Sequence, residues 1–167
     1  MCSVVWVLNF ISFMFLTVHA ASGLVLGKYL DNSLLAFLAG FISHLILDII
    51  PHDALEWKKW RANKIFKFFF TVVFVEAPIM IVIAAILFSQ QKLILNWPTF
   101  WAVSGAVLLD FLFGFDYLCP RCKIFSFFHR LNNWIHEIIT TDYFLPWYQW
   151  VPLQVFFLDL FLVIYVL

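Results

Sequence analysis

The sequence predicts an all-α membrane protein, a single polytopic domain over residues 1–167 with about five transmembrane helices and one amphipathic surface helix. Hydrophobic residues make up 65% of the chain and charged residues 12%, and the mean hydropathy is +0.97. A soluble domain has roughly 45–50% apolar and about 25% charged residues. The apolar residues also gather in long runs, which is typical of helices that cross a bilayer.

Five apolar runs approach the length of a spanning helix, which is about 17–25 residues. They cover residues 3–30, 34–50, 66–88, 98–118 and 147–167. The first connection, "KYLDNS", is short and turn-like, and Asp31, Asn32 and Ser33 could each cap the helix that follows. Pro98 suits the first turn of the fourth helix, because no N–H is needed there.

The first run has an alternative interpretation as a secretory signal. Small residues around Ala20, in "FLTVHAASG", are similar to a signal-peptidase site. A signal normally begins with a charged region, whereas this chain begins "MCSVVW". The start of the chain therefore favours retention of residues 1–20, with cleavage as the alternative.

The fourth connection, residues 119–146, is amphipathic, and we expect it to form a helix along the membrane surface. Its apolar residues recur at helical spacing: Phe125, Phe128, Leu131, Ile135 and Ile138. It begins with a Cys-x-x-Cys pair, Cys119 and Cys122. Such a pair can bind structural zinc with two further ligands, but no histidine follows at the spacing of an ordinary zinc finger, which favours a reduced, unliganded pair.

Basic residues are concentrated in the second and fourth connections. They are Lys58, Lys59, Arg61, Lys64 and Lys67 in the second, and Arg121, Lys123 and Arg130 in the fourth. Because basic loops stay on the cytoplasmic side, these two connections and the N-terminus are predicted to be cytoplasmic. The net charge of zero at pH 7 argues against a nucleic-acid partner and leaves membrane lipid as the expected surroundings. The oligomeric state does not follow from these patterns.

A helical hairpin folded between Asp31 and Asn32 would bring two histidines to the same depth. His19 and His44 each lie 12.5 residues from the midpoint of that hairpin. At 1.5 Å per residue this is about 19 Å, in the cytoplasmic half of a hydrocarbon core about 30 Å thick. Asp48 lies one helical turn further towards the cytoplasm.

Two other runs bring a carboxylate to the same depth. Asp110 lies 12 residues beyond Pro98, and Glu76 lies 12 residues before Phe88. An ionisable group near the bilayer centre costs a few kcal/mol, so it usually faces a partner or a watery cavity. Four of the five runs therefore direct an imidazole or a carboxylate to one level.

A divalent metal, most simply zinc, accounts for this cluster. Neutral imidazoles and carboxylates are zinc ligands, and carboxylates also offset the charge of the ion in a low-dielectric site. His44 and Asp48 are four residues apart and share a helix face. We expect His19, His44, Asp48 and Asp110 to hold one or two ions. The alternative is structural, with buried polar groups bonding one another between packed helices.

Further candidates lie outside the apolar runs. Pro51 disfavours helix at the preceding residue, so His52 and Asp53 are expected in a turn at the mouth of the site. His52 could act there as a ligand, or both residues could cap the helix. His129 and His136 are seven residues apart and share one face of the surface helix. They could complete the metal site or lie among lipid headgroups.

The stretch "HAASGLVLGKYLDNSLLAFLAGFISHLILDIIPHD", with "GAVLLDFLFGFD" and "FFHRLNNWIH", resembles small bacterial inner-membrane proteins grouped as membrane-bound metal-dependent hydrolases. This resemblance covers most of the chain. A shorter stretch, "SHLILDIIPH", is similar to the His-x-x-x-Asp signature of zinc-dependent phospholipase C and related nucleases, in which that pair binds metal. In this chain His52 follows Pro51 directly, whereas the phospholipase-like pattern places its last histidine further on.

Together these features predict a metal-dependent hydrolase that acts on an ester or phosphoester, with a lipid as possible substrate. Glu76 or Asp53, if not bound to metal, could act as the general base. Glu76, beside Pro78, could instead bond freed backbone. Two other classes stay open: a transporter of protons or metal ions, and a non-catalytic assembly protein whose polar cluster only fixes helix packing.

Overall fold

The computed structural model describes residues 16–50, 72–119, 121–139 and 147–167. All regular secondary structure in these residues is helical, which confirms the predicted all-α class. The elements are α2 (Leu16–Tyr29), α3 (Ser33–Leu47), η1 (Val72–Glu76), α6 (Ala77–Ser89), α7 (Trp97–Leu118), α8 (Lys123–Ile139) and α9 (Trp147–Val166). η1 is one turn of π-helix that continues directly into α6.

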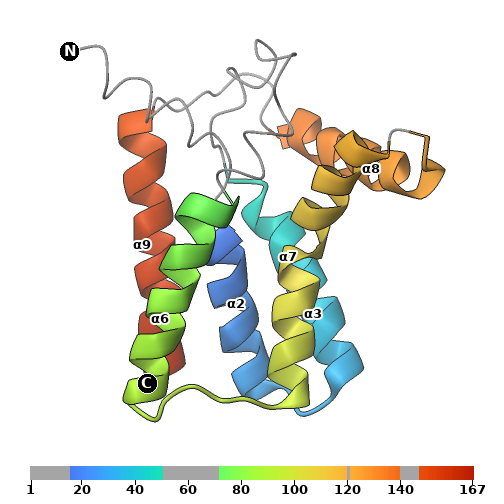
Figure 1. The fold of residues 1–167 in the computed structure, drawn as a ribbon. Coiled ribbons are helices and arrows are strands. Elements are labelled where there is room, and N and C mark those ends of the chain that lie inside the picture. The colour runs from blue at the N-terminus through green and yellow to red at the C-terminus, as the bar shows by residue number, and fades with distance from the viewer. Residues whose placement is uncertain (1–15, 51–71, 120, 140–146) are drawn as a thin grey trace.

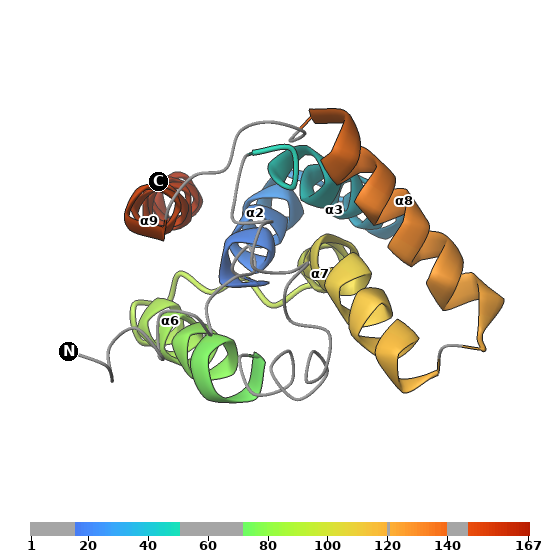
Figure 2. The ribbon, with the colours of Figure 1, turned by 90° about the horizontal axis from the view of Figure 1, so that it is seen from above.

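The axes of five helices, α2, α3, α6, α7 and α9, are roughly aligned and form a bundle, and α8 lies across one end of it (Figure 1). The α2–α3 turn and the α6–α7 connection lie together at the opposite end. Seen along the bundle, α2 occupies the middle (Figure 2). It contacts α3, α6, α7 and α9, whereas α7 packs against α2, α3 and α8. The candidate site lies where α2, α3 and α7 meet.

Polar caps set the starts of two helices at this opposite end. The side chain of Asn32 accepts hydrogen bonds from the backbone N–H groups of Leu34 and Leu35, at 2.9 and 3.0 Å. Asn96 accepts one from the N–H of Thr99 at 2.8 Å, and Pro98 lies in the first turn as predicted. The turn between α2 and α3 therefore falls within the "KYLDNS" stretch, and of its three candidate caps Asn32 is the one used.

We expect Asn32→Ala to lower the free energy of unfolding by about 1 kcal/mol, because two N–H groups at the start of α3 lose their acceptor. Reversible unfolding in mixed detergent micelles measures this change. Asp31→Ala, at the exposed neighbouring position, is the matched control and should have a smaller effect. Equal stability of the two variants would contradict the capping role.

Small residues allow α2 and α3 to approach α7 closely. A Cβ atom added at Gly40 would overlap the carbonyl oxygen of Ala102, and one added at Gly23 would lie 2.7 Å from the Cα of Val103. Ala102 and Ala106 are fully buried at this contact. Close backbone approach through glycine and alanine is typical of helix pairs in membranes, where lipid supplies no hydrophobic force to drive association.

Within the described residues, two helices are long and apolar enough to cross a bilayer: the continuous helix Val72–Ser89 and Tyr148–Val166. The apolar helix Ser33–Leu47 and the apolar part of α7, Trp97–Leu112, are shorter. The five predicted crossings are therefore not confirmed by helix length. α3 has 15 residues and so extends about 22 Å, less than the core thickness of about 30 Å. The start of the first predicted run lies outside the described residues.

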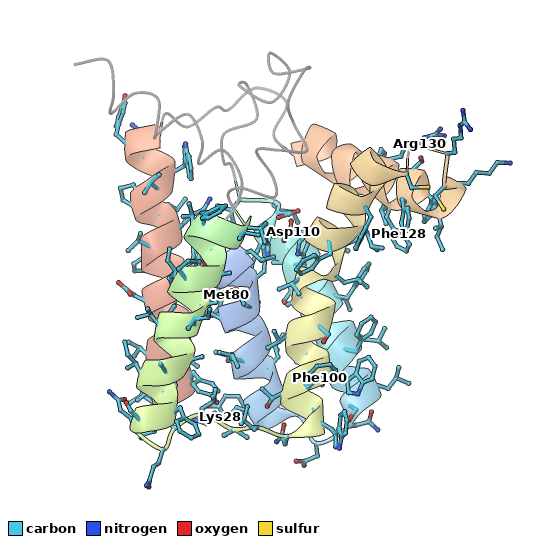
Figure 3. The ribbon with its side chains drawn as sticks, viewed as in Figure 1. Lys28, Met80, Phe100, Asp110, Phe128 and Arg130 are labelled. Carbon is cyan, nitrogen blue, oxygen red and sulfur yellow. The ribbon has the colours of Figure 1, made fainter. Side chains whose placement is uncertain are left out.

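α8 confirms the helix predicted within residues 119–146. It begins at Lys123 and ends at Ile139. Both Arg130 and Phe127 are exposed, so the helix presents charged and apolar side chains outside the bundle (Figure 3).

Candidate metal centre

His19 and His44 meet inside the bundle, as the hairpin predicted. Their rings stack with centroids 4.0 Å apart and an interplanar angle of 22°. Both side chains are 0% exposed. The two histidines come from adjacent antiparallel helices, and their equal distance from the α2–α3 turn brings them to one level.

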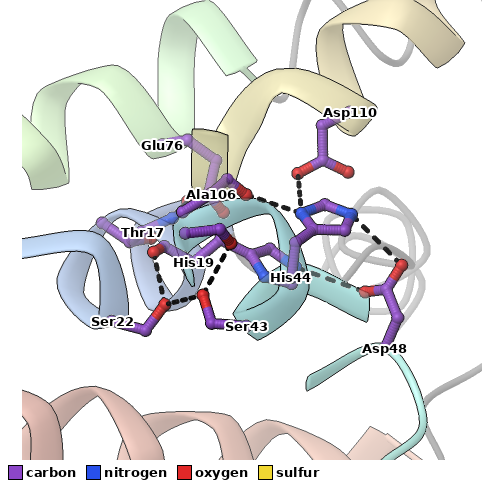
Figure 4. A network of polar contacts seen from close by, with 10 residues as sticks. Thr17, His19, Ser22, Ser43, His44, Asp48, Glu76, Ala106 and Asp110 are labelled. Atoms are coloured by element: carbon purple, nitrogen blue, oxygen red, sulfur yellow. Dashed lines mark hydrogen bonds and ion pairs between the residues drawn. The ribbon is translucent and has the colours of Figure 1, made fainter. Parts of the chain in front are cut away.

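Asp48 contacts both stacked histidines through the two oxygens of its carboxylate. One carboxylate oxygen, Oδ1, is 3.3 Å from Nε2 of His19, and the other, Oδ2, is 3.3 Å from Nε2 of His44. Asp48 is the C-cap of α3, one turn after His44, and is 4% exposed. The carboxylate therefore faces both imidazoles from one side (Figure 4).

These spacings suit a shared ion and are longer than a typical charge-assisted hydrogen bond. A charge-assisted N–H···O bond is about 2.7–2.9 Å long. By contrast, two ligands at about 2.0–2.1 Å from a zinc ion, at the tetrahedral angle, stand about 3.3–3.4 Å apart. Among the described residues, Asp48 is the polar contact of both Nε2 atoms. One ligand atom from each of the three residues lies within 4.8 Å of the other two, so the group could hold a metal ion.

The backbone of α7 fixes the tautomer of His44. Its Nδ1 lies 2.6 Å from the carbonyl oxygen of Ala106. A carbonyl can only accept, so Nδ1 carries the proton, and in the neutral ring Nε2 then presents its lone pair towards Asp48. A hydrogen bond from the other ring nitrogen is the usual support of a metal-ligating histidine.

Asp110 lies on the protonated side of His44. Its Oδ2 is 3.8 Å from Nδ1 of His44, and its side chain is 24% exposed. The structure thus places Asp110 beside the ring nitrogen that faces away from Asp48. As a result, it occupies the position of a carboxylate that supports a ligand, rather than that of a ligand in the three-residue group.

Glu76 is buried against the first turn of α2. One oxygen, Oε2, accepts a hydrogen bond from the backbone N–H of Thr17 at 3.0 Å and another from the Thr17 hydroxyl. Thr17 precedes His19 by two residues, so the contact brings Glu76 close to the centre (Figure 4). It also joins η1, from which Glu76 projects, to α2.

Two serines stabilise the α2–α3 contact beside the histidines. The hydroxyl of Ser22 donates to the carbonyl of His19 at 2.7 Å, and that of Ser43 donates to the carbonyl of Gly40 at the same distance. The two hydroxyl oxygens lie 3.2 Å apart, and because each hydroxyl has one proton, a hydrogen bond between them takes the place of one of the two bonds to a carbonyl. This contact joins the backbones that carry the two ligands.

Several predicted site residues lie outside the described part of the structure. His52 and Asp53 lie outside the described residues. His129 and His136 belong to α8, but their side chains also lie outside the described part of the structure. Cys119 and Cys122, at the α7–α8 junction, are free thiols.

Sequence reasoning missed Thr17 and Ala106, and it missed a pattern that would have predicted the direction of the ligands. On three helices, small residues at four-residue spacing lead directly to a site residue. The three series are Gly27–Gly23–His19 on α2, Ala36–Gly40–His44–Asp48 on α3, and Ala102–Ala106–Asp110 on α7. Residues four apart share a helix face, so each site residue continues a packing face.

Comparison of the chain with protein-family models, with curated proteins and with solved structures gave no match.

Proposed function

We propose that the protein is a membrane-embedded, metal-dependent hydrolase that acts on an ester or phosphoester of a lipid. The observation that supports this best is the buried group of His19, His44 and Asp48, with two imidazole nitrogens each 3.3 Å from a different oxygen of one carboxylate. Two histidines and one carboxylate are a ligand set used by catalytic zinc, which keeps one coordination position for water.

The three residues would act as ligands, and zinc bound there would lower the pKa of a water molecule to about 7. Asp110 and the Ala106 carbonyl would hold the His44 ring in place. Asp48 and Asp110 together would offset the two positive charges of the ion, which a low-dielectric interior requires. A second ion would need further ligands, for which His52, His129 and His136 are the candidates.

Hydrolysis also needs a base. In the proposed reaction, the oxygen of water bonds to the carbonyl carbon or phosphorus, and the bond to the leaving alkoxide breaks. A carboxylate takes a proton from the water, and the leaving oxygen gains one. Glu76 is the candidate among the described residues, because its contact with Thr17 holds it beside the ligands. Asp53 is the other candidate.

A membrane setting with about five crossings agrees with the outer surface of the bundle. α3 exposes Leu34, Leu38, Ile42 and Ile46, and the other long helices also expose large apolar side chains. Exposed apolar surface of this extent promotes aggregation in water but suits contact with lipid. We propose an inner-membrane protein of a bacterial type, with the N-terminus and α8 on the cytoplasmic side.

The test is metal analysis of protein purified without chelators, followed by assay of product release from labelled phospholipid. We expect about one zinc per chain, loss of hydrolysis on chelation and recovery on adding zinc. Asp48→Asn should lower both metal content and hydrolysis. A wild-type chain that stays metal-free, and whose stability Asp48→Asn leaves unchanged, would instead support a packing role. Ion flux in liposomes without product release would support a transporter.

We expect Asp110→Asn to weaken zinc binding by about 10-fold, in the range found for residues that support a metal ligand. The loss is limited because the Ala106 carbonyl still accepts from Nδ1 of His44. Competition with a chelator of known affinity measures the change. Ser104→Ala, on the same helix, is the control, because its hydroxyl bonds only the carbonyl of Phe100 in the described structure. A complete loss of zinc from Asp110→Asn would make Asp110 a direct ligand.

A further inference from the structure

An apolar cleft of about 140 Å³ lies between α2, α6 and α7. Ala20 and Leu24 line it from α2, Met80 and Ala84 from α6, and Val103 from α7. Thr17 supplies the only polar side chain in this lining. The cleft exists because α6 contacts α2 only lightly and because alanines stand where larger side chains would close the gap.

The cleft adjoins the candidate metal centre at one end. Thr17, which lines it, donates two hydrogen bonds to Glu76 and lies two residues from His19. Leu24 lies seven residues further along α2, so the lining extends about 10 Å along that helix. The cleft is therefore polar where it meets the site and apolar over the rest of its length.

Hydrocarbon is the occupant that matches this lining. Water does not fill an apolar cavity of about this size, whereas small apolar molecules do. The outer face of α6 exposes Ile79, Ile81, Val82 and Ile86, so α6 stands in apolar surroundings. In a bilayer those surroundings are lipid tails, which can enter a cleft at the edge of α6.

We infer that this cleft binds one acyl chain of a phospholipid and directs its ester or phosphoester group to the His19–His44–Asp48 centre. The bound lipid is a substrate only if the protein is the hydrolase proposed above. Binding of the acyl chain itself can be tested without hydrolysis. The gradient from Thr17 to Leu24 matches a lipid of the cytoplasmic leaflet, with its polar linkage at the site and its tail directed towards the bilayer centre.

The first test fills the cleft. Ala84→Phe places a ring among the lining residues, whereas Ala85→Phe places the same ring on the exposed side of α6. We expect Ala84→Phe to lower kcat/KM for a long-chain phospholipid by about 10-fold relative to a short-chain, water-soluble analogue, mainly through KM. Bound zinc should equal that of wild type. Ala85→Phe should change neither the preference for the long-chain substrate nor the bound zinc. Equal chain-length preference in all three proteins would overturn the inference.

The second test does not depend on catalysis. A diazirine amino acid introduced by codon suppression at position 80 alone carries the photoreactive group into the cleft. Illumination in phospholipid nanodiscs should join it to an acyl chain, as a peptide mass would show. Ala84→Phe should reduce this adduct, and Ala85→Phe should not. Adducts to another peptide of the chain, or adducts that Ala84→Phe leaves unchanged, would overturn acyl-chain binding. If Ala84→Phe loses the adduct while the wild-type protein has neither bound zinc nor hydrolytic activity, acyl-chain binding in the cleft would be supported and the hydrolase rejected.

Discussion

His44→Ala is expected to remove zinc from the purified protein and to abolish hydrolysis of labelled phospholipid. Three protein ligands hold the proposed ion, and His44 is the one whose tautomer the fold fixes, through the 2.6 Å contact of Nδ1 with the Ala106 carbonyl. Loss of a ligand should weaken binding by more than about 100-fold, beyond the range found for residues that only support one. Metal stoichiometry after chelator competition gives the readout.

The matched control for this variant is Ser43→Ala at the preceding residue. Ser43 bonds the Gly40 carbonyl and lies beside Ser22, but it offers no ligand to the group of three. It should keep its zinc and lose only a little stability. If His44→Ala folds and still binds one zinc per chain with wild-type affinity, the centre described here is not the metal site.

Gly40→Val is expected to have the largest effect on stability, about 3 kcal/mol. Glycine to a residue with a side chain often stabilises a helix interior, because glycine costs roughly 0.5–1 kcal/mol relative to alanine. At this position the added Cβ would meet the carbonyl oxygen of Ala102, which is backbone and cannot turn aside. α3 would have to move away from α7, and His44 would lose its contact with Ala106.

Unfolding in mixed micelles and zinc content should therefore change together in Gly40→Val. Ala85→Val adds bulk at an exposed position of α6 and should stay within about 0.5 kcal/mol of wild type, with full zinc content. Reduced stability with normal zinc binding would show that the α3–α7 contact does not position the centre. Unchanged stability would mean that the two helices are further apart than described.

The shared level of His19 and His44 could be predicted from the sequence, but the directions of the site side chains could not. Counting residues from the "KYLDNS" turn placed His19 and His44 at one level because an α-helix rises by a constant amount per residue. Depth alone does not say which way a side chain points. The faces of small residues at four-residue spacing hold that information, since they show which side of each helix packs against α7.

The position of Asp110 illustrates the remaining gap. Its depth made it a candidate ligand, and the structure places it near the centre but on the Nδ1 side of His44. That distinction depends on the rotation of α7 and on a backbone acceptor, Ala106, which no side-chain pattern reveals. The number of membrane crossings could not be predicted either, because the apolar runs of a sequence do not show where a helix such as α3 ends. It ends at Leu47, short of a full span.

The proposed metal centre, in a bilayer, would also impose an order of events in biogenesis. α2 supplies His19, α3 supplies His44 and Asp48, and α7 supplies the acceptor that orients one ring. Helices enter a bilayer as separate units before they associate, so no single inserted segment contains a complete binding site. Metal capture would then be a late step of maturation, and zinc occupancy would report that the three helices had come together correctly.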